Sequence, residues 1–160
     1  MKVLFISIAL ILCYENSQAQ YLSDDGFTIG MSQDSAIKII RSMGLSNLKE
    51  TKKSMFGSRL IDGVLLFYVF GFCNDKLSLH RKDILPSIEN LIFILKDLSS
   101  KYGNEFKTYT NISMTAVGEE RSLSFLWREP LYRVDIIFNV FPNNNSLTIR
   151  YQTPGKCNED

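Results

Sequence analysis

The sequence is poor in the residues that build reaction centres, because its 160 residues include one histidine and three cysteines. It contains no glycine-rich phosphate loop, no zinc-ligand spacing and no nucleophile elbow. His80 lacks partners for a metal site or for a nucleophile and its base, so we expect it on the surface at the end of a strand. Glu119 and Glu120 are adjacent, so their side chains point apart. These absences predict a protein that is not an enzyme and that uses no cofactor or metal ion.

An excess of charge of one sign is also missing. The chain has 18 Lys and Arg residues against 17 Asp and Glu residues, which gives a formal net charge of +1. Proteins that bind nucleic acid usually carry a basic surplus, so nucleic acid is not an expected partner. Hydrophobic residues make up 45% and charged residues 22% of the chain, proportions typical of a folded domain rather than a disordered one.

Long apolar runs are absent except at the start of the chain. Lys2 supplies a positive charge, residues 3–13 are almost wholly apolar, and the small residues Ser17 and Ala19 follow. This layout is typical of a secretory signal peptide that is cleaved after Ala19. The apolar run is about half of the roughly 20 residues that a membrane-spanning helix needs.

The sequence therefore predicts a signal peptide over residues 1–19 and a single domain over residues 20–160. The protein is expected to be secreted or periplasmic, with no membrane span once the signal is removed. Cys13 raises the question of a lipid anchor. Leu12 stands directly before Cys13, where the bacterial lipid-attachment motif has a small residue, so we do not expect a lipoprotein.

Removal of the signal leaves two cysteines, Cys73 and Cys157. A pair of cysteines in an exported chain is most simply a disulfide. A bridge across so long a loop is expected to stabilise the fold by roughly 4–5 kcal/mol in the chain-entropy account. Two unpaired thiols are the alternative.

Two segments show the three-and-four spacing of amphipathic helices. The first follows Ser32, a plausible N-cap, and ends at Gly44. The second is expected to be capped by Asp83, to carry Pro86 in its first turn, and to end at Gly103.

Most of the remaining chain has the alternating pattern of strands. Residues 64–72 are apolar on both faces, which predicts a central strand that is buried on both sides or covered by a helix. Residues 74–75 form a turn candidate before a strand over residues 77–81, and residues 106–151 predict an antiparallel meander. The polar segment 48–56 is expected to be an edge strand or a loop. The sequence thus predicts an α+β fold with two helices packed on one antiparallel sheet.

A short motif carries a family resemblance. Gly30-Met31-Ser32 opens a helix, Gly44 follows it, and a hairpin ends in Cys73-Asn74-Asp75-Lys76-Leu77. Residues 27–81 resemble the SmpA/OmlA family of small outer-membrane lipoproteins and the repeat unit of the β-lactamase inhibitor protein. The resemblance implies a short helix on a small antiparallel sheet, although the lipid-attachment context is absent here. A second interpretation takes residues 84–152 as a degenerate copy, which gives two helix-then-sheet units in tandem.

The aromatic residues suggest a function, because a sheet covered on one face leaves the other face available for binding. Aromatic and arginine residues on such a face are typical of protein-binding hot spots. The sequence predicts an exported, non-catalytic protein-binding module, such as an inhibitor, an immunity factor or an envelope accessory protein. The alternative is a small exported hydrolase with an unrecognised site, which would gather acidic groups around His80. The candidate partner-binding residues are Tyr109, Arg128, Arg133, Phe141 and Arg150.

Overall fold

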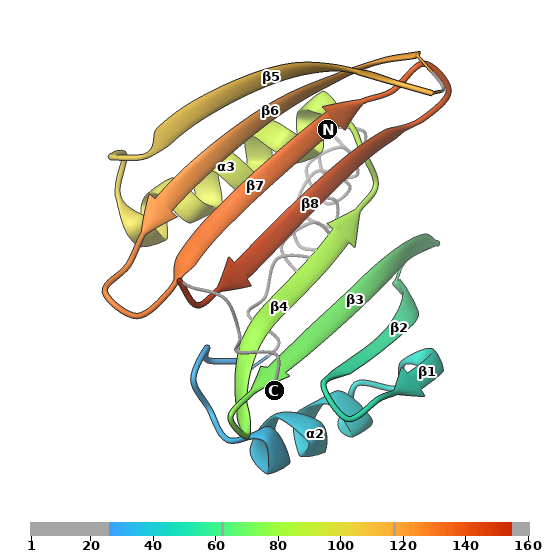
Figure 1. The fold of residues 1–160 in the computed structure, drawn as a ribbon, viewed down its shortest axis with the longest axis vertical. Helices are drawn as coiled ribbons and strands as arrows, with labels where there is room; N and C mark the ends of the chain where they lie inside the picture. Colours follow the sequence, from blue (N-terminus) through green and yellow to red (C-terminus); the bar gives the residue numbers. More distant parts are fainter. Residues whose placement is uncertain (1–25, 62, 117, 155–160) are drawn as a thin grey trace, which may run out of the picture.

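A computed structural model describes residues 26–61, 63–116 and 118–154. Within these ranges the chain forms a helix and four strands, followed by a second helix and four strands (Figure 1). All eight strands belong to one antiparallel sheet with the order β1-β2-β3-β4-β8-β7-β6-β5. The sheet therefore runs through the whole described part of the molecule.

The first half begins with a helix whose start agrees with the sequence prediction. The Ser32 hydroxyl oxygen accepts a hydrogen bond from the Ser35 backbone N–H at 3.3 Å, which caps the helix. The predicted turn at Asn74 and Asp75 is also confirmed, because both residues have the positive φ of a tight hairpin turn, at 50° and 57°. The elements of this half are α2 (Gln33–Ser42), β1 (Ser46–Glu50), β2 (Ser54–Ile61), β3 (Val64–Cys73) and β4 (Lys76–Ile84).

The second half has the same order of elements and ends beside the first. Its last strand pairs with β4, from Leu79 opposite Gln152 to Ile84 opposite Leu147. We call this β4–β8 pairing the joint. The elements of this half are α3 (Ile88–Tyr102), β5 (Lys107–Thr115), β6 (Gly118–Arg128), β7 (Arg133–Val140) and β8 (Asn145–Gln152).

The second helix starts later than predicted. β4 continues to Ile84, and Ser87 caps α3 by accepting a hydrogen bond from the Asn90 backbone N–H at 3.1 Å. Pro86 explains the shift, because the residue before a proline is disfavoured in helical conformation. The expected cap, Asp83, instead lies within β4.

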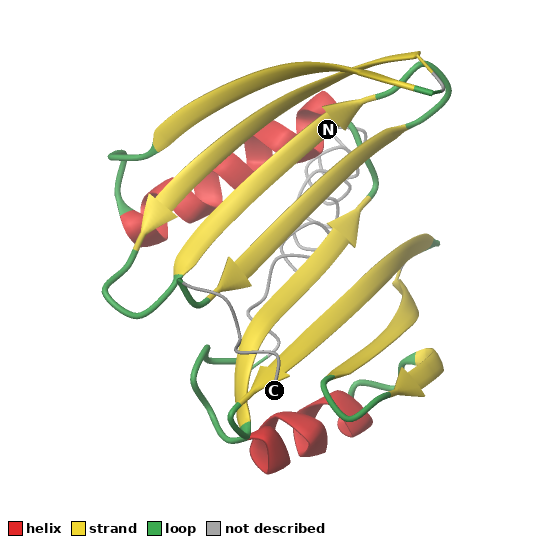
Figure 2. Ribbon diagram, viewed as in Figure 1, coloured by secondary structure: helices red, strands yellow, loops and turns green. Residues whose placement is uncertain are grey.

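The predicted α+β class is wrong, because the fold is dominated by its sheet (Figure 2). The two described helices contain 10 and 15 residues, whereas strands occupy most of the rest of the described chain. Polar segments account for part of the error. β1 and β5 are largely exposed and lack a strong apolar alternation, yet both pair with a neighbour through backbone hydrogen bonds.

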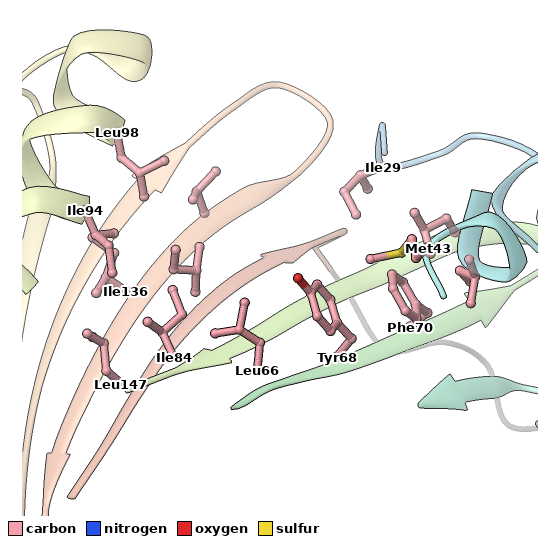
Figure 3. Packing of buried hydrophobic residues seen from close by; sticks show 14 of the residues in the cluster. Ile29, Met43, Leu66, Tyr68, Phe70, Ile84, Ile94, Leu98, Ile136 and Leu147 are labelled. Atoms are coloured by element: carbon pink, nitrogen blue, oxygen red, sulfur yellow. The ribbon is translucent and has the colours of Figure 1, made fainter. Parts of the chain in front are cut away.

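The core lies between the sheet and the two helices, which cover the same face. Figure 3 shows Leu66, Tyr68 and Phe70 on β3 pointing to the side on which the helices lie, and Ile94 on α3 pointing back toward the sheet. Trp127 is the largest fully buried side chain. We call this face of the sheet the covered face and the opposite one the open face.

The cysteine prediction stays a prediction. Cys73 is the last residue of β3. Cys157 lies outside the described residues, as does the expected signal peptide over residues 1–19.

Candidate protein-binding face

The open face presents one continuous row of side chains across all eight strands. In antiparallel ladders, residues directly opposite each other share a face, so the strand registers identify the members of the row. From β1 to β5 along the sheet order, the row consists of Lys49, Phe56, Val69, Arg81, Arg150, Asp135, Leu126 and Lys107.

The charges of the open face are mostly basic. The same registers place basic side chains on strands from both halves of the sheet, with fewer acidic side chains between them. The basic residues are Lys49, Arg81, Lys107, Arg128, Arg133 and Arg150, and the acidic ones are Asp83, Glu120 and Asp135. This uneven distribution gives one face a basic surplus that the net charge of +1 conceals.

Four of the five candidate partner-binding residues share this face. Tyr109 lies opposite Ser124, Arg128 lies opposite Arg133, and Arg150 lies opposite Asp135. The fifth candidate, Phe141, follows β7 in the turn to β8, where its backbone N–H donates to the Asn144 carbonyl oxygen at 2.9 Å. Phe141 is therefore not part of the strand face.

Asp135 fixes two of these arginines. Arg150 donates from Nε and Nη2 to the Asp135 Oδ2 atom, at 2.9 and 2.7 Å. Arg133 Nε lies 3.3 Å from the same oxygen, and Arg133 Nη2 donates to the Gln152 Oε1 atom at 3.2 Å. Because Asp135 is buried, both guanidinium groups are anchored while parts of them still face solvent.

A third anchored arginine, Arg81, lies on β4, the strand that pairs with β8 at the joint. Arg81 donates from Nε and Nη2 to the two carboxylate oxygens of Asp83, at 2.9 and 2.8 Å. The hydroxyl group of Thr148 on β8 donates to the Asp83 Oδ1 atom at 2.6 Å. Since Arg81 also lies opposite Arg150, the joint carries two adjacent arginines held by carboxylates.

An apolar hollow of about 410 Å³ lies beside these arginines on the open face. Phe56 and Phe67 form its exposed apolar part, with 38% and 50% of their surfaces accessible. We call it the phenylalanine hollow. It is lined by Asn47, Lys49, Phe56, Gly57, Ser58, Phe67, Tyr68, Val69, Arg81 and Asp83.

The apolar sequence of β3 gives no sign of this hollow, because it predicts a strand that is buried on both sides or covered by a helix. The strand is internal, as predicted, but the helices cover one face only, so Leu65 and Phe67 remain exposed on the other. The residues that indicate an open face lie in the next strand, β4. Arg81 and Asp83 alternate with buried residues of β4, which marks a face open to solvent.

The prediction of a surface position for His80 is wrong. Only 4% of its surface is exposed, and its ring stacks between Phe70 and Tyr151, with centroid distances of 5.2 and 5.7 Å. Its Nε2 atom is buried without a hydrogen-bond partner in the described part of the chain. Burial, and secondarily the charge of Lys82, lower the pKa of His80 from 6.5 to about 3.

A small cavity of about 130 Å³ adjoins His80 on the covered face. Its described lining is mainly aromatic and includes no carboxylate: Phe27, Thr28, Ile29, His80, Lys101, Tyr102, Tyr132 and Tyr151. Across residues 26–154, apart from the two undescribed positions, no three His, Cys, Asp or Glu side chains are placed to hold a metal ion. Neither described helix has the length and apolar character needed to cross a membrane.

Comparison with known proteins identifies no relative of this chain. No protein-family model, curated protein or solved structure matches the chain.

Proposed function

We propose that this protein is an exported, non-catalytic binding module that recognises an acidic protein surface through the open face of its sheet. The observation that carries the proposal is the placement of anchored arginines directly beside an exposed apolar hollow. Arginine and aromatic side chains dominate the binding energy of protein interfaces. A basic face favours a partner of opposite charge, because complementary potentials speed encounter and exclude wrong partners.

The anchoring of the arginines supports binding of a folded partner. A guanidinium group already held by Asp135 or Asp83 loses less side-chain freedom when a partner carboxylate arrives. The same carboxylates disfavour a nucleic-acid partner, since they lie among the arginines that a phosphate backbone would contact.

The surroundings of His80 give little support to the alternative of a hydrolase. A hydrolase of that kind needs a base and a polarising group around its histidine. The described side chains around His80 are mainly aromatic, and its lowered pKa keeps it neutral above about pH 3.

Replacement of two arginines tests the proposed face. A double Arg128→Ala/Arg133→Ala variant is expected to weaken partner binding by about 1–4 kcal/mol, because hot spots concentrate in arginine and aromatic anchors. The partner is first captured by the mature protein from its native envelope or medium. Binding of each purified variant to that partner is then measured by titration calorimetry.

A matched control removes the same charge elsewhere. Lys38 and Lys96 are exposed on α2 and α3, so a Lys38→Ala/Lys96→Ala variant should bind as the wild type does. A Phe67→Ala variant probes the hollow alone and should weaken binding by about 2 kcal/mol. If the arginine and phenylalanine variants both bind like the lysine control, the open face is not the interface.

Export makes a separate prediction about processing. Protein recovered from the periplasm or the medium should begin at Gln20, because the signal layout places cleavage after Ala19. Intact mass spectrometry of that material measures the N-terminus directly. Recovery of a chain that keeps Met1 in the membrane fraction would contradict export of a cleaved protein.

A further inference from the structure

The two edges of the sheet differ in how well they are protected. β1 has five residues, and its register with β2 shifts between Ser46 and Lys49. Asn47 within it has a φ of 52°, which interrupts the extended backbone. A short, irregular edge strand of this kind is a poor template for another strand.

The other edge, β5, has none of these protections. It has nine residues and an unbroken register with β6 from Lys107 to Thr115. Lys107 at its first position is its one charged residue, and it contains no proline. Ile112 and Met114 are 65% and 78% exposed. A long, regular edge strand with a single charge and exposed apolar side chains pairs readily with a further strand.

We infer that β5 pairs antiparallel with β5 of a second copy of this chain, so that two sheets form one continuous sheet. Pairing about Asn111 places Lys107 of one copy opposite Thr115 of the other, so the basic residues lie at opposite ends. On the covered face, Ile112 of each copy lies opposite Thr110 of the other. No like charges meet across the strands, which makes β5 complementary to itself.

The molecule already contains an association of this kind. The joint connects two helix-and-meander units through an antiparallel pair of their last strands, with both helices on one face. That pairing extends over six residue pairs, whereas β5 offers nine residues. The β5 pairing repeats this arrangement between molecules through the first strand of the second unit.

Symmetry determines the geometry of this dimer. A two-fold axis perpendicular to the sheet keeps both α3 helices on the same face. The two open faces then lie side by side. The dimer depends on the edge strand β5 alone. It does not require the open face to bind a partner.

The test is the mass of the mature protein in solution, measured by sedimentation equilibrium over a wide concentration range. The wild type should be a dimer in reversible equilibrium with its monomer. An Ile112→Lys variant should raise the dimer dissociation constant at least tenfold, because a lysine on an edge strand opposes pairing. Met114→Lys provides a second edge variant, and circular dichroism verifies that both are folded.

Leu131→Lys is the matched control, since Leu131 is similarly exposed but lies in the turn between β6 and β7. It should leave the dissociation constant unchanged. A wild type that stays monomeric overturns the inference. So does a dimer that both edge variants leave intact, or one that the Leu131 variant weakens equally.

Discussion

Between about pH 7 and about pH 4, the wild-type protein is expected to lose about 3 kcal/mol more of its free energy of unfolding than a His80→Phe variant. Burial lowers the folded-state pKa of His80 to about 3, against an ordinary value of 6.5. Below pH 6.5 the unfolded chain therefore binds a proton that the folded chain excludes. The contribution of neutral His80 is fully present above pH 6.5 and is lost progressively as the pH falls toward 3, at about 1.4 kcal/mol per pH unit.

Phenylalanine is a suitable replacement because the site is an aromatic stack. It keeps the ring contacts with Phe70 and Tyr151 and removes the buried Nε2 atom that lacks a partner. Urea unfolding of both proteins at about pH 7 and about pH 4 measures the difference, while the titration of the carboxylates is common to both. Parallel pH profiles would show that His80 takes up a proton in the folded chain as readily as in the unfolded chain, which contradicts a lowered pKa.

A Trp127→Ala variant is expected to lose about 3–5 kcal/mol of its free energy of unfolding, because removal of a buried aromatic ring leaves a cavity in the core. Trp127 is 1% exposed, and its ring packs against Phe106 with a centroid distance of 4.9 Å. Its Nε1–H donates to the Gly103 carbonyl oxygen at 2.9 Å, which ties β6 to the C-terminal end of α3.

Circular dichroism during urea unfolding measures this loss, since removal of the only tryptophan eliminates the usual fluorescence signal. Trp127→Phe keeps a ring and removes the indole hydrogen bond, so it should cost less, about 1–3 kcal/mol. Equal stability of Trp127→Ala and the wild type would contradict the packing of α3 on β6.

Local features of the fold could be predicted from the sequence, because they depend on neighbouring residues. Ser32 caps its helix through a contact three residues away, and Asn74 and Asp75 form a turn by their own conformations. The pairing of β4 with β8 could not be predicted in this way. It joins strands that are distant in the chain, and no local pattern specifies which edge β8 meets.

The outward-facing arginines of the candidate site could be predicted from the sequence, whereas the phenylalanine hollow could not. Arg128, Arg133 and Arg150 alternate with inward-facing apolar residues, and a period of two places them on the outer face. Phe67 is apolar in a strand that is apolar throughout, so alternation cannot distinguish its exposed face from its buried one. The same reasoning failed for His80, whose burial depends on rings from other elements.

The strand order also has a consequence for how the chain folds. Every ladder except the joint links strands that are adjacent in the chain, so each meander can form from local contacts of low contact order. The joint closes a far longer loop and is expected to form last. During synthesis, β4 therefore has an unpaired edge until β8 has been made. A chain interrupted before that point presents β4 as an unpaired and aggregation-prone edge.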